Sequence, residues 1–310
     1  MNRFTPLRGP IALPGRLGRR IDAMAAAMMQ APGMEIDFTR PAGEPALAAP
    51  DSVSWRVFKN PIALYVGGAA AVLLELAEPR VRDGVWQHST FRQDALTRLQ
   101  RTGMAAMVTV YGPVSVAEKM IAGVVRAHER VIGTTAEGYP YQANDPELLL
   151  WVQATATFGF IGAYSRFVRE LSPEEMDRGV AEAAPGARLY GVEEPPQSWA
   201  ELQAVFAQFD ERLVPSPVIF EFLEIMRGVE ALPDVARPLQ KRLLKAAADL
   251  LPEHLRQRIG LDTGEWRLHA WERALVTGVG RAADRLVLRQ APPAQACLRM
   301  GLPEDWLYGR

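Results

Sequence analysis

Helix-start signals recur along the whole chain, whereas no stretch alternates apolar and polar residues as a half-buried strand would. Asp94 and Ser198 stand before apolar-periodic runs, and Asp145 precedes a proline, which favours the first position of a helix. The sequence therefore predicts an all-α fold, a single multi-helix domain arranged as a bundle. Helices are expected over residues 18–31, 61–76, 94–110, 115–131, 145–170, 198–213, 217–229, 237–251, 253–259 and 265–288, with a short helix after Ser172.

A connector rich in Pro, Gly and Ala spans Pro32 to Pro50, between the first expected helix and the rest of the chain. We therefore expect residues 1–50 to form an N-terminal arm with one helix and residues 51–310 to form the helical domain. A domain of that size is ample for a continuous apolar core.

Charge and cysteine content exclude several classes of function. The chain has 35 basic and 36 acidic residues, a net charge of −1, which argues against a nucleic-acid-binding protein. Its single cysteine, Cys297, excludes an internal disulfide framework and a thiolate zinc site. The chain also lacks a nucleotide-binding glycine motif, a zinc-protease motif and a serine-hydrolase elbow.

Nothing in the sequence predicts a transmembrane segment. The most apolar stretch, Pro61 to Leu76, is shorter than the roughly 20 residues that span a bilayer, so we expect a buried core helix there. Arg19-Arg20 precedes a short apolar run, but Asp22 lies between them and no cleavage site follows. This favours an amphipathic helix over an export signal, and we expect a cytoplasmic protein.

The helix expected around His128 has an apolar stripe at Ala117, Ile121 and Val124. The next helical step lands on His128, where the pattern calls for an aliphatic residue. An inward imidazole needs a partner for its ring nitrogens, because an unpaired buried polar group costs roughly 1–3 kcal/mol. That partner is either a neighbouring carbonyl, as in many core histidines, or a metal ion.

Arg98, Arg101 and Thr102 share one face of the helix that Asp94 is expected to cap. The same helix continues toward Val110 as a segment that is apolar nearly all round, so its polar first turns lead into the core. A guanidinium near a core needs an anion, and carboxylates of a bound ligand would suit it. The alternative is a set of ordinary salt bridges at a solvated helix end.

Three more polar residues stand out against apolar surroundings. Thr155 lies on a very apolar predicted helix, where its hydroxyl either bonds back to a main-chain carbonyl or lines a pocket. His88 lies shortly before the helix of Asp94, and either packs a turn or faces a site. Glu78 stands before Pro79, where the preceding helix is expected to end.

Four motifs in a fixed order resemble one family of oxygenases. The family is the one shared by rubber oxygenase (latex clearing protein) and the fungal ER-bound oxygenase of mycophenolic acid biosynthesis. The resemblance is strongest over residues 60–170 and extends more weakly to residue 261. The motifs are Gly84-Val-x-x-His-Ser-x-Phe91, Leu96-x-Arg98-Leu-x-x-Thr102, Val125-x-x-His128-x-x-Val131-x-Gly133, and Ala-Asn-Asp-Pro-Glu-Leu-Leu-Leu-Trp-Val-x-Ala-Thr from Ala143 to Thr155.

The resemblance implies a helical bundle around a buried b-type haem whose iron is held by one histidine. By motif position, His128 resembles that axial ligand, and Arg98 and Thr102 resemble an Arg–Thr pair needed near the haem. His88 and Thr155 are further candidates for the haem pocket. The implied activity is an oxidoreductase that activates dioxygen or a peroxide on a hydrophobic small molecule.

The chain departs from the family pattern at three positions. Arg101 stands where the rubber enzyme has a lysine that can cap the distal side, and arginine stays protonated and is a poor iron ligand, which favours an open or water-bound sixth site. Glu78 and Gln153 stand where relatives often carry histidine. Glu78 thereby becomes a candidate acid–base group, alongside Arg98, Arg101 and Thr102.

Two other functions compete with an oxygenase. One is a haem protein that serves as a peroxidase, a sensor or an electron carrier. The other is a helical interaction protein without a cofactor, which only the missing histidines at Glu78 and Gln153 support. In that second case His128→Ala would perturb the core and nothing else.

Overall fold

The structure is a computed structural model that describes residues 9–12, 15, 22–23, 31–232, 237–262 and 264–308. Helices dominate these residues, which confirms the all-α prediction. They are α2 (Val53–Phe58), α3 (Pro61–Glu75), α4 (Pro79–His88), α5 (Ala95–Tyr111), α6 (Val114–His128), α7 (Pro146–Phe167), α8 (Pro173–Tyr190), α9 (Trp199–Phe209), α10 (Pro217–Gly228), α11 (Arg237–Leu250), α12 (Glu253–Arg258), α13 (Ala270–Ala283) and α14 (Pro292–Arg299), with 3-10 helices at Asp210–Arg212, Gly264–Trp266 and Trp306–Tyr308.

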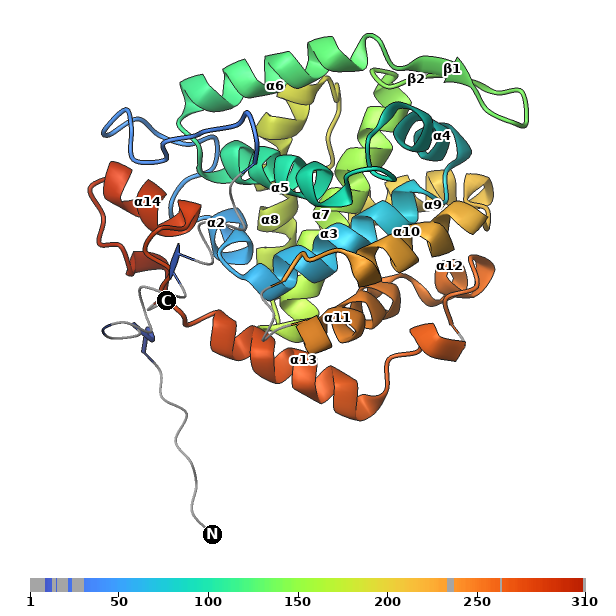
Figure 1. Ribbon diagram of the computed structural model, residues 1–310. Coiled ribbons are helices and arrows are strands. Elements are labelled where there is room, and N and C mark those ends of the chain that lie inside the picture. The colour runs from blue at the N-terminus through green and yellow to red at the C-terminus, as the bar shows by residue number, and fades with distance from the viewer. Residues whose placement is uncertain are drawn as a thin grey trace.

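Helices α3 and α7 pair more extensively than any other two elements in the described chain, and they cross near the centre of the molecule (Figure 1). The crossing depends on two glycines. A Cβ atom at Gly67 would lie 2.6 Å from the carbonyl oxygen of Gly159, so only residues without a side chain let the two backbones approach this closely.

The starts of both central helices follow the sequence prediction. The Asn60 side chain accepts hydrogen bonds from the amides of Ile62 and Ala63, and Pro61 occupies the first helical position of α3. Asp145 caps α7 in the same way, ahead of Pro146. A capping side chain followed by a proline therefore sets where each of α3 and α7 begins.

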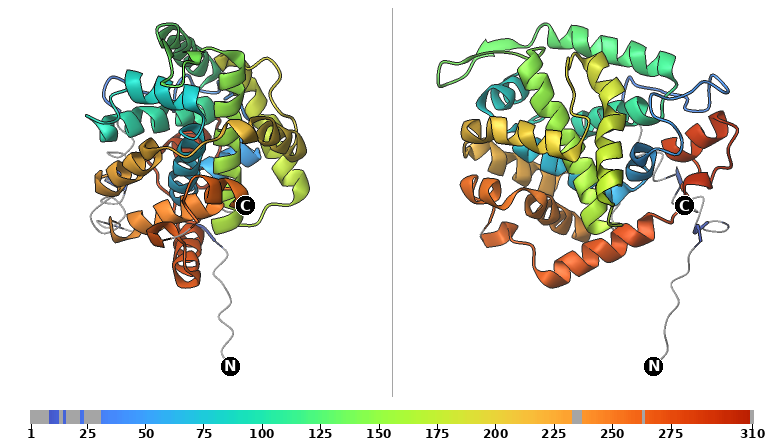
Figure 2. Two further views of the ribbon diagram at one scale, coloured as in Figure 1. Left: turned by 90° about the vertical axis from the view of Figure 1, so that its right-hand side faces the viewer. Right: turned by 180° about the vertical axis from the view of Figure 1, so that it is seen from behind.

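The other helices cover this central pair from different sides. Helices α11 and α13 pack against both α3 and α7, and α8 and α9 pack against α7. Helices α5 and α6 lie next to each other on the opposite side from α13 (Figures 1 and 2). The largest fully buried side chains include Trp55, Trp151, Tyr111, Tyr164 and Phe167.

Several elements were not expected from the sequence: the helices α2, α4 and α14 and a small hairpin. Helix α4 begins at Pro79, with Glu78 as its capping residue, so the Glu78-Pro79 step that was expected to end one helix instead starts another. A small antiparallel hairpin, β1 (Ile132–Thr134) and β2 (Pro140–Gln142), links α6 to α7. Three residues per strand are too few to show a period of two in the sequence.

Several predicted helix boundaries are wrong. The helix predicted from residue 115 to residue 131 is α6, which begins at Val114 and ends at His128, and the Ser115 amide donates to a carboxylate oxygen of Glu44 over 2.7 Å. Helix α8 is long rather than short and runs through Pro185. The last predicted helix starts at Ala270 instead of residue 265, and α14 follows it.

The segment before α2 packs onto the end of the chain. Arg299 is 3% exposed and donates to the main-chain carbonyls of Glu44, Phe38 and Tyr111 over 2.7–2.8 Å. This cation therefore joins residues 38–44 to α5 and α14. The helix predicted for residues 18–31 lies almost wholly outside the described residues, and the division at residue 50 stays a prediction.

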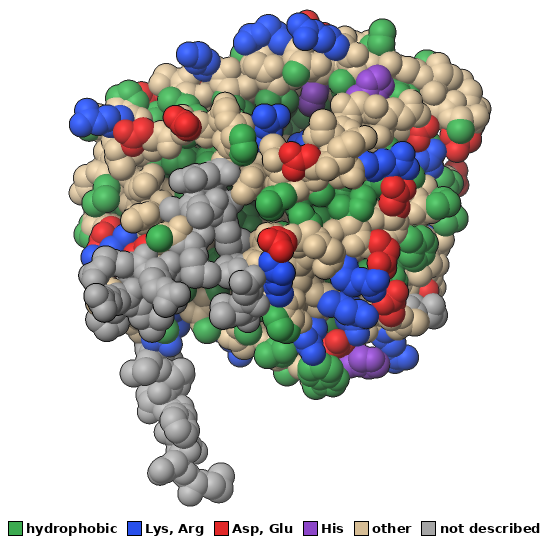
Figure 3. Space-filling model, viewed as in Figure 1, with side chains coloured by type: hydrophobic (Ala, Val, Ile, Leu, Met, Phe, Trp, Pro, Cys, Tyr) green, Lys and Arg blue, Asp and Glu red, His purple; other side chains and the backbone are tan. Residues whose placement is uncertain are grey.

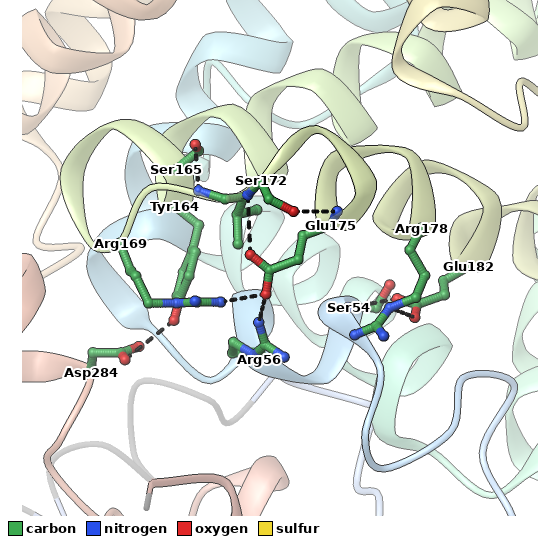
Figure 4. A network of polar contacts seen from close by, with 11 residues as sticks. Ser54, Arg56, Tyr164, Ser165, Arg169, Ser172, Glu175, Arg178, Glu182 and Asp284 are labelled. Atoms are coloured by element: carbon green, nitrogen blue, oxygen red, sulfur yellow. Dashed lines mark hydrogen bonds and ion pairs between the residues drawn. The ribbon is translucent and has the colours of Figure 1, made fainter. Parts of the chain in front are cut away.

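A carboxylate at the start of α8 ties three elements together (Figure 4). Glu175 accepts hydrogen bonds from Arg56 on α2, from Arg169 after α7, and from the amide of Ser172. Burial by itself would raise the pKa of Glu175, but these hydrogen bonds outweigh it and lower that pKa to about 2. The carboxylate is thus charged throughout the physiological range.

Helix α7 is the one described helix long and apolar enough to cross a membrane, and 61% of its most apolar window is buried inside the protein. Helices α3 and α4 together pass the same test only as a pair bent by 110°. An apolar helix at the centre of a fold meets these criteria too, and α7 lies there.

Candidate functional site

Arg98 and Thr102, predicted to share one helix face, contact each other on α5. The Arg98 guanidinium donates to the Thr102 hydroxyl, and that hydroxyl donates to the Arg98 carbonyl over 2.8 Å. Arg98 is half-buried and Thr102 is exposed. Among the described residues Arg98 has no salt-bridge partner, so the alternative of ordinary salt bridges at this helix end is not what the structure shows for Arg98.

Arg98 acts electrostatically on two groups from other helices. Its charge lowers the pKa of Glu75, at the end of α3, and it lowers the pKa of His128, at the end of α6. Such effects need proximity, because solvent screens distant charges. Arg98 therefore lies near both Glu75 and His128, which come from segments far apart in the sequence, and we take the three as the candidate site.

Glu75 is the residue of this site that the sequence analysis missed. Burial raises the pKa of its carboxyl to about 7, although Thr155 and Arg98 both act to lower it. The Thr155 hydroxyl donates to Glu75 Oε1 over 3.3 Å and is also close to the Val152 carbonyl. A signal was available, because Glu75 is the only charged side chain in the helix from Pro61 to Glu75.

Thr155 is fully buried. The sequence left open whether its hydroxyl bonds back to a main-chain carbonyl or faces a site, and it does both. Its hydroxyl lies 2.9 Å from the carbonyl of Val152, as in a core helix, and it also faces the Glu75 carboxyl. Thr155 thus joins α7 to the site through a titratable group.

His128 is the last residue of α6. The apolar stripe predicted on this helix is only partly buried. Ala117 and Ile121 are buried, whereas Val124 and His128 are half-buried. Burial first, and then the charge of Arg98, lower the pKa of the imidazole, so it is neutral at physiological pH. Its Nδ1 atom is buried without a hydrogen-bond partner among the described residues.

Three other residues that were predicted for the site make local structural contacts. Arg101 is exposed and donates to the carbonyl of Pro32 over 3.2 Å. His88 is exposed at the end of α4, with Nε2 3.1 Å from the Tyr141 hydroxyl. Glu78 is 1% exposed, caps α4 through the Val81 amide, and pairs with Arg80. Their predicted roles in catalysis or cofactor binding stay predictions.

One face of α3 remains partly exposed in an otherwise buried helix. The residues of that face recur at helical spacing and end at the carboxyl: Leu64, Tyr65, Gly68, Val72 and Glu75. In the space-filling view, apolar side chains are visible in the region between α5 and α10, where Figure 1 shows α3 (Figure 3). The cavity lined by Pro50, Asp51, Ser52, Arg56, Trp306 and Leu307 contains none of these residues.

The donor set of this site fits a haem better than a bare metal ion. No group of three or more His, Cys, Asp or Glu side chains that could hold a metal occurs in the described part of the chain. A porphyrin supplies four nitrogen ligands itself, so one neutral imidazole such as His128 is enough. A guanidinium without a carboxylate partner, Arg98, and an apolar helix face are also what a haem with propionates requires.

The fold is that of an all-α protein, and its candidate site combines a histidine, an arginine and a titratable carboxyl. Residues 55–285 match the family described as "ER-bound oxygenase mpaB/B'/Rubber oxygenase, catalytic domain". The match covers most of the chain, and the chain belongs to this family, as the four motifs predicted. No curated protein and no solved structure matched the chain.

Membership in an oxygenase family makes the chain an oxygenase-type oxidoreductase that uses dioxygen and a small-molecule substrate. The matched range contains α3 to α13, and therefore Glu75, Arg98, His128 and Thr155. The same four residues that the geometry brings together thus lie within the catalytic domain.

Proposed function

We propose that this protein is an oxygenase that depends on haem b and oxidises a hydrophobic small molecule. The observation that carries the proposal is that Arg98 on α5, which has no carboxylate partner among the described residues, lies near enough to His128 on α6 and to Glu75 on α3 to lower the pKa of each. When bound, the haem would supply the chemistry of dioxygen activation at its iron. The protein residues then have to hold the haem, exclude water and handle protons.

His128 is the residue proposed to hold the iron. Its imidazole is neutral, because burial and Arg98 lower its pKa, and only the neutral ring has a lone pair for a metal. The other three histidines have less suitable surroundings. His88 contacts Tyr141, His254 lies 2.9 Å from an Asp210 carboxylate oxygen, and His269 caps α13.

Arg98 is proposed to bind a haem carboxylate. Guanidinium groups pair with carboxylates through two parallel hydrogen bonds, and Arg98 has no other carboxylate within salt-bridge distance among the described residues. Thr102 restrains the guanidinium through its hydroxyl. Replacing Arg98 with lysine would keep the charge but remove the paired donors.

Glu75 is proposed to hold and release a proton next to the reacting groups. A carboxyl whose pKa is about 7 is present in both protonation states near neutral pH, which suits a general acid–base. The hydroxyl of Thr155 orients one carboxylate oxygen. The apolar face of α3 beside it, including Val72 and Gly68, favours a hydrophobic substrate.

The experiment is a haemin titration of the purified protein, followed by absorption spectroscopy, for the wild type, His128→Ala and His254→Ala. We expect the wild type and His254→Ala to bind one equivalent of haem with the same spectrum. We expect His128→Ala to lose the bound spectrum or change its ligation. Equal binding by His128→Ala, or no binding by the wild type, would refute the proposal and favour an interaction protein.

A further inference from the structure

The side chain of Asn144 lies beside the last turn of α6. Its Nδ2 group donates to the carbonyl of Val125 over 3.0 Å, and Val125 lies one helical turn before His128. Asn144 itself directly precedes Asp145, the capping residue of α7. The carboxamide is therefore held between the end of one helix and the start of the next.

Two polar atoms next to this bond are buried without partners. They are Oδ1 of Asn144 and Nδ1 of His128, and neither has a hydrogen-bond partner among the described residues. Leaving a buried polar atom unpaired costs about 1–3 kcal/mol. One of these atoms can only accept a hydrogen bond, and the other can donate one, so they complement each other.

Main-chain hydrogen bonds bring the two side chains to the same end of α6. Nδ2 of Asn144 donates to the carbonyl of Val125, in the last turn of the helix, and the chain turns back just after His128. The carboxamide oxygen and the imidazole nitrogen are therefore buried at the same helix end, where each is the kind of partner that the other lacks.

The bond to Val125 decides which end of the carboxamide faces the ring. Because Nδ2 donates to the Val125 carbonyl, Oδ1 is the end left for His128. An oxygen there requires that Nδ1 carry the hydrogen. The neutral imidazole then has its lone pair on Nε2, the nitrogen that remains for a metal.

The hairpin between α6 and α7 returns Asn144 to this position. After His128 the chain turns, with the Val131 amide donating to the His128 carbonyl over 2.9 Å. Strands β1 and β2 then carry it out and back, and the Ala143 amide donates to the Val131 carbonyl over 2.9 Å. The register of the hairpin thus places Asn144 next to α6, 19 residues after Val125.

We propose that Asn144 is the positioning residue of His128: its Oδ1 accepts a hydrogen bond from Nδ1–H and so keeps Nε2 free to bind iron. The role in iron binding rests on the proposed function, but the tautomer is a property of the chain without a cofactor. Outer-shell acceptors of this kind orient a metal-bound histidine and increase its basicity.

The first test uses the ¹⁵N-labelled protein without haem, at an alkaline pH where imidazole is neutral. Long-range ¹H–¹⁵N spectra report which ring nitrogen carries the hydrogen, and the His128→Gln spectrum assigns the signals. Free imidazole side chains favour the Nε2–H tautomer. We expect His128 to be the Nδ1–H tautomer in the wild type and to shift toward Nε2–H in Asn144→Leu.

Gln240→Leu is the matched control. Gln240 is another buried carboxamide that donates to main-chain carbonyls, those of Met226 and Val229, and its Oε1 is likewise unpaired among the described residues. It lies on α11, so its removal should destabilise the fold without changing the tautomer of His128. Asn144→Asp keeps an oxygen that faces the ring, and we expect it to keep the wild-type tautomer.

Finding Nε2–H in the wild type, or the same tautomer in the wild type and Asn144→Leu, would overturn the inference. If haem binds, the iron–imidazole stretching frequency in Raman spectra gives a second readout, expected to be lower in Asn144→Leu than in the wild type and in Gln240→Leu. If no haem binds, the proposed function fails, yet the tautomer measurement still decides the role of Asn144.

Discussion

Glu75 and Thr155 are 80 residues apart in the chain, yet their side-chain oxygens lie 3.3 Å from each other. They belong to α3 and α7, the two helices that cross at Gly67 and Gly159. The close approach of these helices therefore places the titratable carboxyl of the site. Four expected outcomes test this arrangement and the contacts that support it.

The crossing of α3 and α7 predicts opposite effects for two neighbouring glycines. In Gly67→Ala the new Cβ would lie 2.6 Å from the Gly159 carbonyl oxygen, so the helices must separate, and we expect a loss of about 2–3 kcal/mol in the free energy of unfolding. In Gly68→Ala the nearest atom is 3.7 Å away, in the Phe160 ring, and the better helix propensity of alanine should add up to about 1 kcal/mol. Urea denaturation measures both. Equal effects of the two substitutions would contradict this account of the crossing.

The raised pKa of Glu75 predicts that the protein loses stability as the pH increases. Burial raises this pKa from 4.5 to about 7, so between these values the folded state binds more protons than the unfolded state. Stability from this group is then highest below pH 4.5 and falls as the pH rises toward 7. We expect a loss of about 2 kcal/mol that Glu75→Gln removes. Parallel curves of unfolding free energy against pH for the two proteins would argue against it.

Glu175 predicts the opposite pH dependence. Burial favours its neutral form, but hydrogen bonds from Arg169, Ser172 and Arg56 dominate and lower its pKa from 4.5 to about 2. Its contribution is present above pH 4.5 and is lost as the pH falls to about 2. We expect Glu175→Gln to lower the free energy of unfolding at neutral pH by about 1–2 kcal/mol, with the difference vanishing in acid.

Glu174→Gln is the control for this substitution, because Glu174 is exposed on the same helical turn. Acid titrations of all three proteins, followed by circular dichroism, distinguish the two positions. A Glu174→Gln protein as unstable as Glu175→Gln would show that general charge, not the contacts in Figure 4, sets the acid stability.

The contacts of Arg299 predict that replacing it loosens the segment before α2. Arg299→Met leaves three carbonyl groups without their donor, the buried ones of Phe38 and Tyr111 and the part-buried one of Glu44, and we expect a loss of about 3 kcal/mol. Hydrogen exchange should accelerate around residues 38–44. The matched control is Arg289→Met, whose side chain is 60% exposed and pairs with Glu304, and it should change stability by less than about 1 kcal/mol. Unchanged hydrogen exchange around residues 38–44 in Arg299→Met would show that Arg299 does not hold this segment in place.

Much of the site was predictable because its motifs are local. Arg98 and Thr102 lie one turn apart on a helix whose start Asp94 signals, so their contact follows from helical geometry alone. His128 stood out as a polar residue at the end of an apolar stripe. Glu75 was overlooked because it follows a long apolar run, at a point where a helix end usually meets solvent.

The sequence by itself determined the helical class, the starts of α3, α5 and α7, and the family, because capping residues, prolines and motif spacing act over a few positions. Only the tertiary structure decided that Glu75 meets Thr155 and that Asn144 returns beside His128. Those contacts depend on how closely two glycines let helices approach and on the register of a short hairpin. Neither leaves a periodic pattern in the chain, since each results from packing between distant segments.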